Sequence, residues 1–137
     1  MKKETRIVFD TNIWVSYFIS KRFEELAKLI LDKNITVFST TELVEELKEV
    51  LSRPKFKNQI TLPIERYINF HLQLVTFVSI KKVFTESPDP KDNFLYDLAF
   101  QTKSKLLVTG DRKLLLFEVN DLETISLASF KTRFKHT

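Results

Sequence analysis

Two aspartates in this sequence directly follow apolar segments that are typical of buried strands. Asp10 follows the residues IVF, and Asp111 follows LLVTG. Ligands of open parallel sheets bind beyond the C-terminal ends of the strands, so both carboxylates are candidate site residues. Glu46 and Asp92 are the next candidates, because each lies at the border of the apolar stripe of an expected helix. Their carboxylates are therefore able to turn toward the same crevice.

Four carboxylates in one crevice would repel one another, and a hard divalent cation removes that repulsion. Mg²⁺ and Mn²⁺ prefer oxygen ligands, activate bound water and stabilise charge on phosphoryl oxygens. The sequence spacing alone does not bring the four side chains together, and a simpler explanation exists for three of them. Asp10 and Asp111 could cap the helices that follow them, and Asp92 could interact with a helix dipole.

The composition excludes most other kinds of active site. The 137 residues include no cysteine, which excludes disulfides, thiolate nucleophiles and cysteine-based zinc sites. The chain has only two histidines, His71 and His136, so few residues are available for a histidine-based zinc cluster or a Ser-His-Asp triad. Gly110 is the single glycine, whereas a Walker loop or a G-x-G-x-x-G dinucleotide loop needs at least two. A site made of carboxylates requires none of these residues.

The length and the rest of the composition are typical of one globular domain, which we expect to span residues 1–137. Hydrophobic residues make up 43% of the chain, yet no apolar run reaches the length of a membrane span. The lack of a signal-peptide pattern and of cysteine predicts a cytoplasmic protein with no membrane partner. The net charge of +4 is compatible with a nucleic-acid partner but does not identify one.

Short apolar segments alternate with longer segments of helical spacing along the chain. Strands are expected over 5–9, 35–38, 76–80, 105–108 and 123–126. Helices are expected over 12–19, 23–31, 42–52, 63–74, 91–102, 112–117 and 128–134. Strands that alternate with helices predict an α/β domain with a central, mostly parallel sheet and helices on both faces.

Several motifs follow one another along the chain: VFDTNIWVS near the start, TTELVEELKEVLSRPKF in the middle, and DPKDNFLYDLA followed by KLLVTGDRKLL. Together they resemble the PIN domain family, and more narrowly the PIN-type ribonuclease toxins of bacterial toxin–antitoxin systems. The resemblance runs from about Arg6 to Phe117. Each motif alone is weak, whereas the ordered set, with RPKF after the glutamate-bearing helix, is specific. The resemblance implies a PIN-like three-layer sandwich.

The resemblance also implies roles for particular positions. The implied metal ligands and catalytic residues are Asp10, Glu46, Asp92 and Asp111. They would hold one or two Mg²⁺ or Mn²⁺ ions, with Glu45 as an alternative to Glu46. Asn12 and Thr109 match supporting residues of the site. Gly110 stands at a strand end, where a missing Cβ would let a bound phosphate approach the backbone.

By the same resemblance, the activity is hydrolysis of RNA phosphodiester bonds, mostly in single strands, by a Mg²⁺- or Mn²⁺-dependent endoribonuclease that leaves a 5′-phosphate and a 3′-hydroxyl. The implied partners are an RNA substrate, a cognate antitoxin protein, and further copies of the chain in a homodimer or higher homo-oligomer. Two alternatives remain open: a non-catalytic PIN-like module that binds RNA or protein, and an aspartate-based phosphatase. The phosphatase is the weaker alternative, because Asp10 is followed by Thr11 and Asn12 rather than by the D-x-D pattern.

Basic side chains near the expected pocket are candidates for phosphate binding. They are Arg53, Lys55, Lys57, Arg112 and Lys113, although ordinary surface charge explains them equally well. Trp14 and Tyr17 could stack on bases, but a short helix packed on the sheet favours the core for both. His71 is expected to be a packing residue of its helix rather than a ligand, and His136 is expected to have no role. The IWVSYF stretch, 13–18, is a candidate dimerisation segment.

Overall fold

A computed structural model describes residues 3–135 of the chain. Within them lies one sheet of five parallel strands, in the order β3-β2-β1-β4-β5. The strands are β1 (Thr5–Phe9), β2 (Ile35–Ser39), β3 (Val75–Phe77), β4 (Leu106–Val108) and β5 (Glu123–Ile125). The strand order changes direction between β1 and β4, and the crevice at such a point is where sheets of this kind bind ligands.

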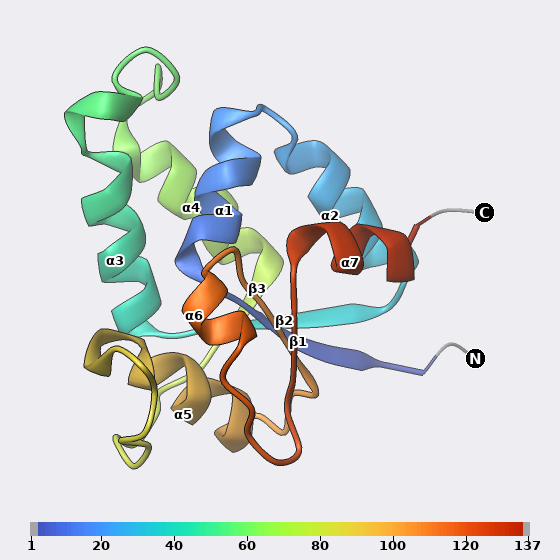
Figure 1. Ribbon diagram of the computed structural model, residues 1–137. Helices are drawn as coiled ribbons and strands as arrows, with labels where there is room; N and C mark the ends of the chain where they lie inside the picture. The colour runs from blue at the N-terminus through green and yellow to red at the C-terminus, as the bar shows by residue number, and fades with distance from the viewer. Residues whose placement is uncertain (1–2, 136–137) are drawn as a thin grey trace.

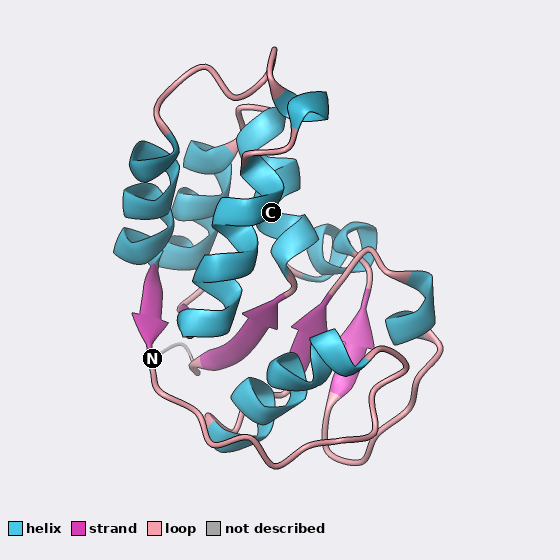
Figure 2. Cartoon of the chain, turned by 90° about the vertical axis from the view of Figure 1, so that its left-hand side faces the viewer, coloured by secondary structure: helices cyan, strands magenta, loops and turns pink. Residues whose placement is uncertain are grey.

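Seven α-helices and two short 3-10 helices accompany the sheet in the described part of the chain. They are α1 (Thr11–Ile19), α2 (Phe23–Asp32), α3 (Thr41–Leu51), η1 (Pro54–Phe56), α4 (Ile64–Leu74), η2 (Pro90–Asp92), α5 (Asn93–Gln101), α6 (Arg112–Leu115) and α7 (Leu127–Arg133). Figure 1 shows α1, α2, α4 and α7 on one side of the sheet and α5 on the other. Figure 2 shows the same strands between two layers of helices. The predicted three-layer α/β sandwich is confirmed, and its sheet is wholly parallel.

The central strand β1 is buried because helices cover both faces of the sheet. Its residues 7–9 have no exposed surface, as expected for a strand covered from both sides. On one face, the ring of Phe9 makes edge-to-face contacts with Trp14 of α1 and Phe130 of α7, with ring centroids 5.6 and 5.1 Å apart. These contacts hold the end of β1 against two helices, and Asp10 comes next in the chain.

The aromatic residues of α1 belong to the core. None of the five apolar residues in the stretch 13–18 is more than 5% exposed. The prediction that Trp14 and Tyr17 are core residues is therefore confirmed, whereas the suggestion that this stretch forms a dimerisation surface is wrong. His71 is also fully buried: its Nε2 lies 2.8 Å from the Ser39 hydroxyl, and its ring meets the ring of Trp14 edge-on at 4.2 Å. His136 lies outside the described residues.

The helix expected over 91–102 begins two residues later than predicted. Asp89 accepts a hydrogen bond from the backbone N–H of Lys91 at 3.0 Å, and Pro90 occupies the first position of the 3-10 turn η2. This turn ends at Asp92, which is the N-cap residue of α5 rather than part of its first turn. The difference matters because it sets the position from which Asp92 enters the site.

Strand β3 ends at Phe77, although the sequence pattern predicted a strand over 76–80. The chain leaves the sheet because the segment 78–89 is fastened to α5. The carboxylate of Asp97 accepts hydrogen bonds from the backbone N–H groups of Val83 at 3.1 Å and Phe84 at 2.9 Å. Asp97 is only 4% exposed, a burial that the helical pattern did not indicate. No helix among residues 3–135 is both long and apolar enough to cross a membrane.

Candidate active site

The carboxylate of Asp10 lies at the end of β1, where β1 pairs with β4. The backbone N–H of Asp10 donates to the carbonyl of Val108 at 2.9 Å, which continues the pairing of the two strands. Three groups donate to its side chain: the N–H of Thr11 at 2.7 Å, the hydroxyl of Thr109 at 2.7 Å and the amide of Asn12 at 3.3 Å. Asp10 therefore caps α1, and its buried carboxylate is held in one orientation.

The hydrogen-bond network around Asp10 continues to Asp111, beyond the end of β4. The backbone N–H of Asp111 donates to the Thr109 hydroxyl at 3.0 Å, and the N–H of Gly110 donates to the side-chain oxygen of Asn12 at 3.1 Å. Asp111 is the N-cap of α6, because its Oδ1 accepts from the N–H of Lys113 at 2.8 Å. The capping role that the sequence allowed is present, and it fixes this carboxylate at the edge of the sheet.

Glu46 and Asp92 reach the same pocket from two other elements. Glu46 on α3 and Asp92 at the end of η2 are both half-buried, while Glu45 is exposed and does not line the pocket. The pocket has a volume of about 430 Å³. The candidate acids that line it are Asp10, Glu46, Asp92 and Asp111. The fold thus brings together the four carboxylates that the sequence left far apart.

Two of these carboxyl groups have raised pKa values. Burial raises the pKa of Asp10 to about 6, against the effect of its hydrogen bonds, and the charges of Glu46 and Asp111 add to the rise. Burial also raises the pKa of Asp92 to about 7, and nearby negative charges, first that of Asp10, raise it further. None of the four acids forms a salt bridge within residues 3–135. The pocket therefore gathers four carboxylates, none of which is paired in a salt bridge.

Residues 6–113, most of the chain, match the sequence profile of the PIN domain. The chain belongs to the PIN domain family. No curated protein matches this PIN domain by sequence.

Solved structures resemble this PIN domain in fold. VapBC2 from Rickettsia felis, bound to a DNA fragment from its promoter, superposes with a TM-score of 0.57 at 18% identity, over 89% of this chain and 98% of that chain. PAE2754 from Pyrobaculum aerophilum gives 0.62 at 13% identity, over 95% and 89%. The PIN domain endonuclease Utp24 gives 0.53 at 13% identity, over 89% and 84%. At these identities the likeness establishes the fold alone.

The donor set of this PIN domain fits a hard divalent cation by its chemistry. All four candidates offer carboxylate oxygens, which Mg²⁺ and Mn²⁺ prefer, and a cation would relieve the repulsion between Asp10 and Asp92. Across residues 3–135, however, no three Asp, Glu or His side chains already surround one point as metal ligands do. The carboxylates border the pocket without converging on one position, so an ion would have to draw them together by side-chain rotation.

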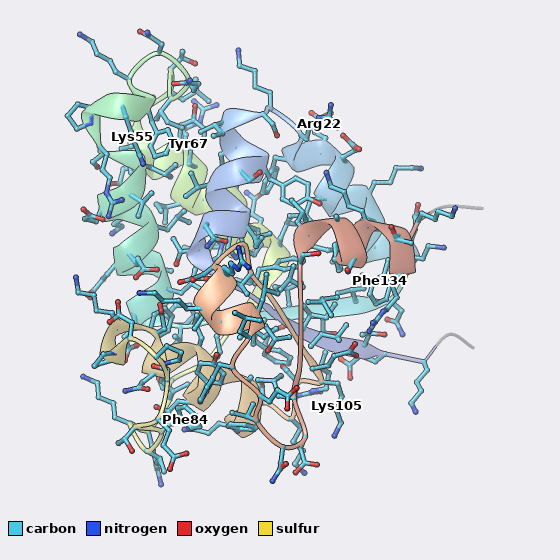
Figure 3. All side chains as sticks on the ribbon, in the orientation of Figure 1. Arg22, Lys55, Tyr67, Phe84, Lys105 and Phe134 are labelled. Carbon is cyan, nitrogen blue, oxygen red and sulfur yellow. The ribbon has the colours of Figure 1, made fainter. Side chains whose placement is uncertain are left out.

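Three basic side chains also line the pocket: Arg53, Lys55 and Lys91. Arg53 donates to both carboxylate oxygens of Glu49, with a shorter distance of 2.8 Å, so part of its charge is already neutralised. Lys55, labelled in Figure 3, lies just past the C-terminal end of α3. Lys91 was not among the predicted residues, although its place directly before Asp92 was an available signal.

The other residues predicted to contact nucleic acid lie outside the pocket lining. Lys57, Arg112 and Lys113 are exposed, and the last two flank the pocket on α6, directly after Asp111. Gly110 is also exposed and has no left-handed backbone. A Cβ there would lie 3.6 Å from the side-chain oxygen of Asn12, an ordinary contact, so the fold itself does not require glycine. The role of Gly110 in admitting a phosphate stays a prediction.

Proposed function

We propose that this PIN domain is a metal-dependent endoribonuclease. The observation that carries the proposal is the pocket lined by four carboxylates, two of which have pKa values raised by burial and by one another's charge. A cluster of acids with no salt-bridge partner costs stability, and such clusters are typical of functional sites. The motif resemblance, and the structural similarity to the PIN domain endonuclease Utp24, support a nuclease among the possible metal enzymes.

Asp10, Glu46, Asp92 and Asp111 are the residues that would hold one or two Mg²⁺ or Mn²⁺ ions. A bound ion of this kind activates water and stabilises charge on phosphoryl oxygens. Asp10 would be the best oriented of the four, because Thr109 and Asn12 hold its carboxylate from the side of β4 and α1.

The basic side chains of the pocket would bind the RNA backbone. Lys91 and Lys55 can contact the phosphates that flank the scissile bond, and Arg53 can do so while it remains tied to Glu49. Attack of water on phosphorus, in line with O3′, would break the P–O3′ bond. O3′ leaves with a proton as the 3′-hydroxyl, and the water oxygen remains on the 5′-phosphate.

The test is cleavage of a labelled single-stranded RNA, by wild type and by Asp10→Asn purified in parallel. We expect cleavage in Mg²⁺ or Mn²⁺ but not in EDTA, and a loss of at least about a hundredfold in Asp10→Asn at unchanged circular dichroism. Cleavage that persists in EDTA, or a folded Asp10→Asn that cleaves at the wild-type rate, would refute the assignment.

We further propose that the protein is the toxin of a toxin–antitoxin pair. The narrower motif resemblance supports this role, as does the similarity of the fold to VapBC2. The proposed partners are a cognate antitoxin and a second copy of the chain. Induced expression should arrest growth, a small neighbouring reading frame should restore it, and light scattering should give the mass of a dimer. Growth that continues under expression of the active enzyme would contradict the toxin role.

A second candidate is a non-catalytic module that binds RNA or protein. The observation that favours it is the lack, among the described residues, of three acidic or histidine side chains already arranged around one point. Calorimetric titration with Mn²⁺ separates the two candidates. Binding that disappears in Asp10→Asn supports the enzyme, and no Mn²⁺ binding by the folded wild type supports the module.

A further inference from the structure

The side chain of Tyr96 is an unsatisfied polar group in the core. Tyr96 lies on α5 with no exposed surface, and its hydroxyl has no hydrogen-bond partner in the described residues. A buried tyrosine hydroxyl normally finds a partner, and an exception in a native protein requires an explanation. Phenylalanine would fill the same space without burying an unpaired hydroxyl. The hydroxyl is therefore a candidate for a function that the protein alone does not reveal.

Two aromatic rings hold Tyr96 in one orientation. The ring of Phe84 stacks on it, with 4.7 Å between centroids and 20° between planes, and the ring of Phe117 meets it edge-on at 5.6 Å. Phe84, labelled in Figure 3 beside α5, is itself fixed by the hydrogen bond from its backbone N–H to Asp97. Tyr96 therefore cannot swing away to find a partner elsewhere.

Tyr96 lies behind the pocket lining, on the same face of α5 as Asp92. Asp92 is the N-cap of α5 and stands four residues before Tyr96, so the two side chains lie on the same face of the helix. Helical side chains lean toward the N-terminus, which carries the phenol over the turn that holds Asp92. The negative charges of Asp92, Asp10 and Asp111 all act on the phenol.

Tyr96 is suited to donate a hydrogen bond rather than to lose a proton. Burial raises the pKa of its hydroxyl to about 12, and the three neighbouring carboxylates contribute in the same direction. A neutral phenol beside ionised carboxylates is a strong donor for them. Groups that donate to metal-binding carboxylates fix the orientation of those ligands.

We propose that Tyr96 is a positioning residue of the carboxylate site, whose hydroxyl donates to Asp92 when a divalent cation draws the acids together. The inference rests on the proposed metal site of this PIN domain. It explains why a tyrosine with an unpaired hydroxyl is buried near three of the acids: its partner is a carboxylate oxygen in the rotated, metal-binding arrangement. Tyr96 would act through Asp92 and would not touch the substrate.

The chain allows a direct spectroscopic test, because it contains only three tyrosines. Protein labelled with ¹³C at the tyrosine ζ carbon should give three signals, of which Tyr96→Phe identifies one. We expect Mg²⁺ titration to shift the Tyr96 signal and to leave those of Tyr17 and Tyr67 in place. A Tyr96 signal that stays still while Mg²⁺ binds would overturn the proposal.

The matched control is Tyr17→Phe, which removes the hydroxyl of another buried tyrosine, on α1, where the nearby negative charge is that of Glu25 and not that of the pocket acids. Tyr96→Phe should weaken Mg²⁺ binding about tenfold and lower kcat, with KM for RNA unchanged, while Tyr17→Phe leaves all three values alone. Without metal, Tyr96→Phe should melt no lower than wild type, because the hydroxyl has no partner to lose. A merely structural tyrosine would give a lower melting temperature and an unchanged Mg²⁺ affinity.

Failure of the metal site and failure of this inference give different results. If wild-type protein binds no Mg²⁺ and none of the three signals moves, the metal site itself is refuted, and the inference with it. If wild type binds Mg²⁺ and Tyr96→Phe binds it equally well, only the role of Tyr96 is refuted.

Discussion

The hydroxyl of Thr109 donates to Oδ2 of Asp10 at 2.7 Å and so joins two residues that are 99 positions apart in the chain. The hydroxyl oxygen of Thr109 also accepts a hydrogen bond from the backbone N–H of Asp111 at 3.0 Å. One hydroxyl thus orients the carboxylate at the end of β1 and holds the next acid along β4. Its full burial keeps water from replacing it, so both hydrogen bonds depend on the side chain.

Replacing Thr109 by valine should damage the site more than the fold. The change keeps the shape but removes one of the three donors to the buried Asp10 carboxylate, which costs about 1–3 kcal/mol of stability. Thr102→Val is the matched control, because the Thr102 hydroxyl is also buried and donates to the Leu98 carbonyl at 2.7 Å, away from the pocket. Chemical unfolding should show a loss in both variants. Mn²⁺ affinity should fall in Thr109→Val alone, and equal affinity in the two variants would contradict the orienting role.

Asp92→Asn should stabilise the metal-free protein at alkaline pH. The folded-state pKa of Asp92 is raised from 3.8 to about 7, so its contribution to stability is present below pH 4 and is lost as the pH rises through 7. Because Asp92 is half-exposed, solvent screening reduces the effect to about 1 kcal/mol. In EDTA at pH 8 the variant should melt above wild type, and at pH 4 the two should melt together. Added Mg²⁺ should reverse the order at pH 8 by stabilising only wild type.

A variant that melts below wild type in EDTA at pH 8 would show that Asp92 is not under electrostatic strain. Asp89→Asn serves as the control, because asparagine is also a good N-cap for η2 and the residue lies outside the pocket lining. It should keep the Mg²⁺ stabilisation that Asp92→Asn loses.

His71 should make the fold sensitive to acid. Burial lowers its pKa from 6.5 to about 4, so the unfolded chain takes up its proton first. Stability from this residue is complete above pH 6.5 and is lost as the pH falls toward 4, by up to about 1.4 kcal/mol per pH unit. Asp10 and Asp92 act in the opposite direction over this range, so the comparison must be between wild type and His71→Gln. Wild type should lose stability relative to the variant between pH 6.5 and 4, and parallel curves would contradict the prediction.

The sequence predicted the layers of the fold, and it selected four acids that line one pocket, because both depend on local pattern. Strand ends, helix stripes and the ordered PIN motifs each select residues from a short stretch of chain. The contacts that build the site are not local. The bond between Thr109 and Asp10 exists only because β4 pairs with β1, and no spacing within one segment encodes that pairing.

The incorrect predictions also arise from contacts between segments that are distant in the sequence. The short apolar segment over 76–80 predicted a strand. However, Asp97 on α5 accepts hydrogen bonds from the backbone of Val83 and Phe84, and β3 ends at Phe77. A helical wheel ranks Asp97 by its angle alone and cannot foresee that a loop will supply its donors. The sequence of the IWVSYF stretch indicates an apolar surface only when the helices that bury it are not considered.

Glu46 and Glu45 provide a test between adjacent positions. Glu46 lines the pocket and its charge contributes to the raised pKa of Asp10, whereas Glu45 is exposed. Glu46→Gln should lower RNA cleavage and Mg²⁺ affinity by about tenfold or more, and Glu45→Gln should change neither. Rates from single-turnover cleavage decide the question. An effect in Glu45→Gln that matches or exceeds that of Glu46→Gln would mean that α3 presents a different face to the metal.

Lys91 should bind the RNA backbone, because it lines the pocket next to Asp92 and has no salt bridge among the described residues. Lys57, exposed and outside the lining, is the matched control. In an Asp10→Asn background, chosen because we expect it to leave the RNA intact, Lys91→Gln should weaken binding of single-stranded RNA of any sequence. The plot of log affinity against log salt should become shallower by about 0.7, the change expected when one phosphate of a single strand is no longer neutralised by the protein. Lys57→Gln should leave this slope unchanged. Equal slopes in the two variants would show that Lys91 does not contact the RNA.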